Sequence, residues 1–186
     1  VDPMTIPTRG RIERVIDTVN DGGAKFMFKG RENTARPNLA VADMMRIALW
    51  AGPRVSEIGG LVVGDIDLAA DFIHVRAQLS RDGKHRAPVK SDYSRRDIPI
   101  APALKPTLRR LTAGRDPEEW LIVSQNGNPI QASHAGKVVR IAAEYVGAPD
   151  VHFHALRHYF VSSLLTAGVA VQDLSLIHIS EPTRPY

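Results

Sequence analysis

The chain of 186 residues contains no cysteine. Disulfide bonds and thiolate metal ligands are therefore excluded, and the composition is consistent with a reducing cytoplasm. The sequence has no long uncharged apolar run, so we expect neither a transmembrane helix nor a membrane partner. The first residues also lack the charged-then-apolar layout of a signal peptide. These absences predict a globular cytoplasmic protein.

Positive charge is in slight excess, with a net charge of +4 and a pI near 9.6. Many of the basic residues gather in one segment: Arg76, Arg81, Lys84, His85, Arg86, Lys90, Arg95 and Arg96. A basic patch of this kind is typical of proteins that bind a nucleic-acid backbone. The candidate contacts are Lys84, Arg86, Arg95 and Arg96. The alternative interpretation is a hairpin whose charges only face solvent.

Apolar periodicity divides the chain into two parts. Residues 1–37 are rich in Gly, Pro, Arg and Asp with one weak helical stretch, so we interpret them as a linker or the end of an upstream domain. From residue 38 the periodicity is regular. It predicts helices over 38–51, 53–61, 103–111, 133–146 (with Ser133 as N-cap) and 154–167.

Strands are expected over 72–75 and 96–100, with a hairpin that turns at Asp82-Gly83 between them. An extended connection is expected over 120–127. The predicted fold class is therefore α+β, a mainly helical domain with a small antiparallel sheet of three strands.

Two short patterns, about a hundred residues apart, carry candidate chemistry. Arg54 and Glu57 lie three residues apart on a predicted helix, so their side chains share a face. His154 and Arg157 repeat this spacing. Each pattern alone is also what a surface ion pair or a solvated histidine gives.

Together, the two patterns suggest a site for one backbone phosphate. Two guanidinium groups can bind phosphate oxygens and offset transition-state charge without a metal or other cofactor. Glu57 would hold Arg54 in position, and His154 could exchange a proton with the attacking or leaving oxygen. A hairpin lysine, Lys84 or Lys90, could protonate the departing oxygen.

Several ordered segments resemble the catalytic domain of the tyrosine recombinases, or phage-type integrases. They are Gly52–Ile58 followed by Leu61 and Gly64–Leu68, Val89–Ser91 with Ser94–Ile100, and His154–Phe160 with Leu165–Val169. The resemblance covers roughly residues 38–173. It favours Lys90 over Lys84 and implies catalytic roles for Arg54, Lys90, His154 and Arg157, with Glu57 bracing Arg54.

The resemblance also implies double-stranded DNA as the partner, with no small-molecule substrate. The implied reaction cleaves one strand through a tyrosine–3′-phosphate linkage and rejoins it, in site-specific recombination and DNA integration. The parent protein is expected to act as a tetramer on DNA.

The end of the chain departs from the family pattern. Residues 174–186 resemble a translated sequencing adapter, so we interpret them as a non-native tail that contributes neither His178 nor Tyr186 to a site. No nucleophile is assigned in this chain, because Tyr93, Tyr145 and Tyr159 all lack the family context and Tyr159 lies on an apolar helix face. We therefore expect this polypeptide alone to be inactive.

Two other functions are compatible with the same residues. One is a non-catalytic DNA-binding module with a recombinase-like fold. The other is an enzyme of the type IB topoisomerase kind, which relaxes supercoils instead of exchanging strands.

Overall fold

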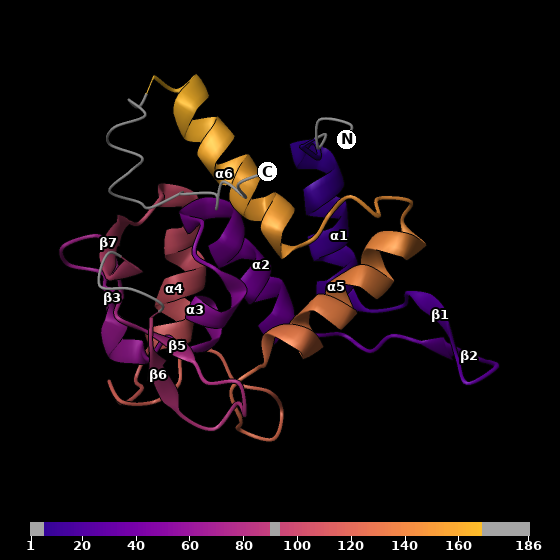
Figure 1. Cartoon of the computed structure of the whole chain (residues 1–186), viewed down its shortest axis with the longest axis horizontal. Helices are drawn as coiled ribbons and strands as arrows, with labels where there is room; N and C mark the ends of the chain where they lie inside the picture. Colours follow the sequence, from indigo (N-terminus) through magenta and orange to yellow (C-terminus); the bar gives the residue numbers. More distant parts are fainter. Residues whose placement is uncertain (1–5, 90–93, 169–186) are drawn as a thin grey trace, which may run out of the picture.

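Helix α2 (Leu39–Ala51) is the centre of the fold. The computed structural model describes residues 6–89 and 94–168, and within them α2 packs against α1 (Arg9–Asp21), α3 (Val55–Gly59), α5 (Ala132–Tyr145) and α6 (Phe153–Thr166) (Figure 1). Asn38 caps α2 by accepting a hydrogen bond from the backbone N of Val41 at 3.1 Å. Gly52 ends the helix with a left-handed φ of 69°. The predicted helix over 38–51 is confirmed.

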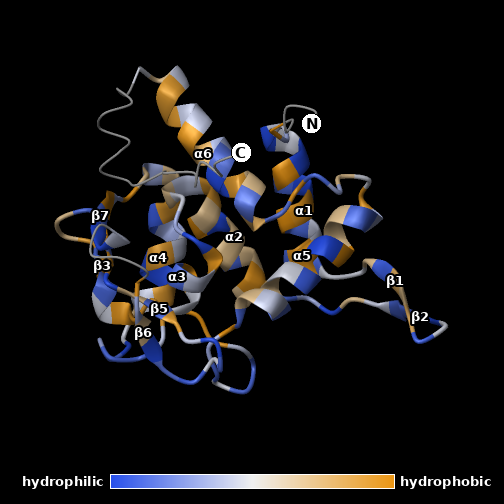
Figure 2. Ribbon diagram, viewed as in Figure 1, coloured by the Kyte–Doolittle hydropathy of each residue, from blue (hydrophilic) through white to orange (hydrophobic). Residues whose placement is uncertain are grey.

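Residues 9–34, interpreted from the sequence as part of a linker or of the end of an upstream domain, form a helix and a hairpin. Four residues of α1, Ile12, Val15, Ile16 and Val19, are buried in the common core. Their spacing of three and four residues forms a single apolar stripe, which the polar composition of the surrounding segment concealed (Figure 2). A hairpin of β1 (Lys25–Phe28) and β2 (Arg31–Thr34) follows and extends beyond the helices (Figure 1).

A small three-stranded antiparallel sheet is present as predicted, in the order β3 (Ile66–Asp67), β4 (Phe72–Val75) and β7 (Arg96–Pro99), but β3 was not among the predicted strands. The short helix η1 (Val63–Asp65) precedes it. Alternation along the strands turns Ile73 and Val75 of β4, and Arg96 and Ile98 of β7, towards the interior. The predicted hairpin forms its own two-stranded ladder, β5 (Ala77–Leu79) with β6 (Arg86–Pro88).

The remaining elements differ in detail from their predictions. The short helix η3 (Pro102–Leu104) leads into α4 (Lys105–Thr112), and α3 ends at Gly59, two residues before its predicted end. The N-cap of α5 is Gln131, so the prediction of Ser133 as N-cap is wrong; Ser133 is the second residue of the helix. The extended connection is held by isolated bridges from Val62 to Trp120 and from Val123 to Pro129.

Candidate functional site

Arg54 lies at the corner between α2 and α3. It is the N-cap of α3, with extended φ and ψ of −69° and 150°, and the helix begins at Val55, two residues later than the predicted start at 53. Its backbone N–H donates to Glu57 Oε2 at 2.8 Å, which closes the start of this five-residue helix. The carboxylate of Glu57 therefore fixes the backbone at Arg54 as well as its side chain.

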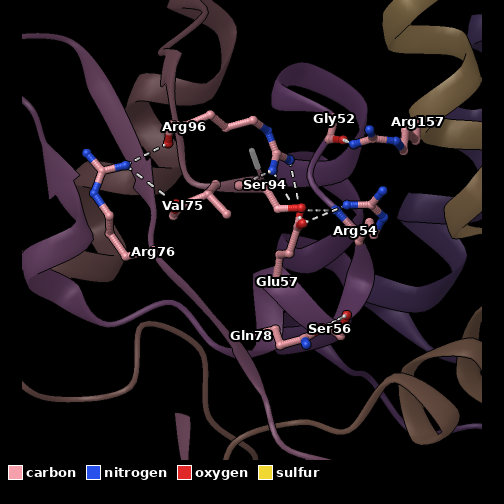
Figure 3. A network of polar contacts seen from close by, with 10 residues as sticks. All are labelled: Gly52, Arg54, Ser56, Glu57, Val75, Arg76, Gln78, Ser94, Arg96 and Arg157. Carbon is pink, nitrogen blue, oxygen red and sulfur yellow. Dashed lines mark hydrogen bonds and ion pairs between the residues drawn. The ribbon is translucent and has the colours of Figure 1, made fainter. Parts of the chain in front are cut away.

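Glu57 is the most constrained group of the site. Its side chain is only 2% exposed, and its carboxylate accepts from Arg54 Nη1 at 3.0 Å and from Arg96 Nη2 and Nη1 at 2.8 and 3.3 Å (Figure 3). Burial raises the pKa of Glu57, but the hydrogen bonds and charges of Arg96 and Arg54 outweigh it and hold the pKa below its ordinary value. Glu57 is consequently an ionised carboxylate with four hydrogen bonds, and its role in bracing Arg54 for a phosphate stays a prediction.

Arg157 reaches the same corner from α6. Its side chain is buried, and Nη1 donates to the carbonyl oxygen of Gly52, 105 residues earlier in the chain. Burial, followed by the charges of Arg96 and Arg54, lowers the pKa of Arg157 to about 10, so the guanidinium stays protonated at neutral pH. Figure 3 shows Arg157 beside Arg54 and Gly52. The structure thus brings together the two arginines that the sequence paired.

His154 lies one turn before Arg157 in α6 and is exposed. Its Nε2 is 2.7 Å from Nε2 of His158, so one ring donates to the other. His152 is the N-cap of α6, and its Nδ1 accepts from the backbone N of Ala155 at 3.2 Å. Burial, and then the nearby His154, lowers the pKa of His152. The roles of His152 and His158 beside His154 were not predicted from the sequence. The spacing of four residues between His154 and His158 in a helix does indicate that these two rings are neighbours.

The predicted DNA-contacting side chains lie in different surroundings. Lys84, Arg86 and Arg95 are exposed, and Arg86 also donates to Asp65 at 2.7 Å. Arg96 is 6% exposed and bound to Glu57, so its assignment to the surface is corrected. The reason is strand alternation, because Arg96 shares the inward face of β7 with Ile98. Lys90 lies outside the described residues.

Two of the tyrosines weighed as nucleophiles are described by the structure. Tyr159 packs against the core, as predicted, and Tyr145 at the end of α5 is 53% exposed. Tyr93 and the predicted tail over 174–186 lie outside the described ranges. Among the described residues, no group of three or more His, Asp or Glu could hold a metal ion, and no helix is long and apolar enough to cross a membrane.

Known proteins share this architecture. The helical domain with its small antiparallel sheet has the fold of integrase catalytic domains. The family model described as "Phage integrase family" matches residues 26–177, and the chain belongs to that family. The match includes the β1–β2 hairpin and extends four residues past the predicted domain end at 173.

The relatives are distant. The tyrosine recombinase XerC of Staphylococcus saprophyticus is 26% identical over 154 residues, which cover 80% of this chain and 48% of the relative. The transposase from transposon Tn916 of Enterococcus faecalis is 26% identical over 153 residues, covering 73% of this chain and 38% of that protein. The chain thus spans about half or less of the length of these curated relatives.

Solved structures agree on the fold. The Tn1549 transposon integrase in complex with circular intermediate DNA has a TM-score of 0.73 at 23% identity, covering 97% of this chain and 61% of that one. The XerA recombinase has a TM-score of 0.64 at 20% identity, and the match covers 95% of this chain and 58% of the XerA chain.

Proposed function

We propose that this domain binds duplex DNA by holding one backbone phosphate between Arg54 and Arg157. The observation that carries the proposal is the convergence of these two arginines, from α3 and α6, around a carboxylate that braces the first of them. A guanidinium fork can donate to two phosphate oxygens at once, and it keeps its charge at any working pH. Membership of the phage integrase family and the DNA complex of the similar Tn1549 integrase support the choice of DNA.

In the longer parent protein, we propose that this site serves strand cleavage and rejoining in site-specific recombination. Arg54 and Arg157 would stabilise the charge that develops on the phosphate, and His154 and Lys90 would handle protons. Assembly of the parent as a tetramer on DNA and a cytoplasmic location belong to the same proposal. The nucleophilic tyrosine is not assigned to this chain.

The binding step is tested by Arg54→Met in a fluorescence-anisotropy titration of a short labelled duplex. We expect weaker affinity, and a slope of log affinity against log salt that is smaller by about one unit, since one phosphate contact is lost. Arg140→Met is the matched control, because Arg140 is 61% exposed on α5 and pairs with the exposed Glu144 one turn further along the same helix face. Unchanged affinity and slope in Arg54→Met would remove Arg54 from the phosphate.

The covalent step is tested separately with a nicked suicide substrate, which traps any tyrosine–DNA intermediate. We expect no adduct from this chain alone. An adduct that maps to Tyr93, Tyr145 or Tyr159 would contradict this and assign the nucleophile. For a longer parent chain, strand exchange without supercoil relaxation would favour a recombinase over a topoisomerase.

A further inference from the structure

A third arginine, Arg96, lies behind the site and shares the carboxylate of Glu57. Each carboxylate oxygen accepts one hydrogen bond from each arginine. Oε2 takes the backbone N–H of Arg54 at 2.8 Å and Nη2 of Arg96 at 2.8 Å. Oε1 takes Nη1 of Arg54 at 3.0 Å and Nη1 of Arg96 at 3.3 Å. A carboxylate offers about four acceptor positions, so Glu57 is saturated.

Arg96 is held there by its own strand. Its side chain is 4% exposed, its Nη1 also donates to the carbonyl oxygen of Ser94 at 3.0 Å, and its backbone oxygen accepts from Arg76 at 3.1 Å. Long charged side chains are seldom this buried unless they are paired. The guanidinium faces Glu57 with both terminal nitrogens (Figure 3).

The charges explain what this arrangement accomplishes. Glu57 alone would neutralise Arg54, which would weaken its attraction for a phosphate. With Arg96 on the opposite side of the carboxylate, the group of Arg54, Glu57, Arg96 and Arg157 carries a net charge of +2, from three arginines and one glutamate. Arg54 keeps a terminal nitrogen directed away from Glu57 (Figure 3), and its side chain is 36% exposed.

We propose that Arg96 is a positioning residue for the phosphate site: it compensates and orients Glu57, so that Glu57 holds Arg54 in place without cancelling its charge. The inference rests on the proposed function, since it assigns to Arg96 an effect on phosphate binding through Arg54. The low pKa of Glu57 and the lowered pKa of Arg157, both caused in part by Arg96, agree with this charge arrangement.

A double-mutant cycle on duplex DNA affinity tests the proposal. The variants are Arg96→Met, Arg54→Met and the double variant, with Arg140→Met to measure the loss of one ordinary surface charge. We expect Arg96→Met to weaken binding about tenfold, because a buried charge-assisted interaction is lost behind Arg54. Since Arg96 acts through Arg54, the double variant should bind no more weakly than Arg54→Met alone.

The conservative variant Arg96→Lys separates charge from geometry. Lysine keeps the positive charge but lacks the fork, so affinity should lie between those of Arg96→Met and the unaltered chain. Independent losses that add in the double variant, or an Arg96→Met affinity no lower than that of Arg140→Met, would overturn the positioning role while leaving the proposed function intact. If Arg54→Met binds as well as the unaltered chain, the proposed function fails and the Arg96 inference fails with it.

One measurement needs no variant and therefore holds even if Arg96→Met does not fold. The ¹³C shift of the Glu57 carboxyl is followed by NMR against pH in the unaltered chain. The pKa obtained from this titration should lie below the ordinary pKa of a glutamate. Titration of Glu57 at or above that value would show that Arg96 does not compensate its charge.

Discussion

Replacing Glu57 with glutamine should destabilise the folded domain strongly, although the side chain keeps its size. One carboxylate oxygen becomes an NH₂ donor that faces two N–H donors, so two of the four hydrogen bonds at Glu57 are lost. Each is charge-assisted and worth about 1.5–3 kcal/mol. The guanidinium of Arg96 also remains buried without its counter-charge. Because Arg54 is partly exposed and screened, we expect a total loss of about 3–5 kcal/mol.

The assay is urea unfolding followed by tryptophan fluorescence, with the two tryptophans Trp50 and Trp120 as probes. The expected loss corresponds to a fall in Tm of roughly 6–20 °C for a chain of this size. Glu13→Gln is the control, because Glu13 pairs with Arg9 at 2.7 Å but is 50% exposed, and its change should stay below about 0.5 kcal/mol.

The pH dependence follows from the lowered pKa of Glu57. The folded state holds the proton less tightly than the unfolded chain, whose glutamate pKa is about 4.3. The stabilisation is therefore complete above that value and is lost as the pH falls through the folded-state pKa. The stability gap between the unaltered chain and Glu57→Gln should be constant near neutral pH and shrink in acid. A gap under about 1 kcal/mol at pH 7, or one equal to that of Glu13→Gln, would show that the buried carboxylate of Glu57 does not stabilise the fold.

Four further substitutions test the packing of the domain by the same unfolding assay. Gly52→Ala should destabilise the fold by about 2–4 kcal/mol, since φ is +69° and a Cβ would lie 2.3 Å from a ring carbon of Phe160. Gly136→Ala in α5 should instead stabilise the fold by about 0.5–1 kcal/mol, because nothing lies within 4 Å of the added Cβ. Equal effects of the two substitutions would contradict this. Asp43→Asn should cost about 2–3 kcal/mol, because the carboxylate is 1% exposed and accepts from two arginines; a neutral result would show those pairs to be unimportant. Ile12→Ala should cost about 2–5 kcal/mol, whereas a loss under about 1 kcal/mol would return the N-terminal segment to the status of a linker.

Local rules account for the elements that could be predicted. The spacing of apolar residues and the Asn38 and Gly52 caps were enough to fix α2, and period-two alternation located β4 and β7. The helical signal of α1 is weak in the sequence because its stripe of four apolar residues is narrow, and α2 and α5, distant in sequence, provide surface against which it packs. The N-cap of α5 was misplaced because Ser133 is a good cap by type, but Gln131 has the extended backbone conformation where the helix begins.

For the site, residue types and their spacing along the chain establish which side chains are available: Arg54 with Glu57 three residues on, and His154 with Arg157 at the same spacing. Helix geometry makes each pair local, so each pair is visible in the sequence. Two contacts depend on the folded arrangement: the packing of α6 on α2 brings Arg157 to Gly52, and β7 directs Arg96 at Glu57 instead of at solvent. Sequence spacing carries no information about contacts between distant elements. The positive charge of an arginine also does not indicate whether its side chain faces water or a buried carboxylate.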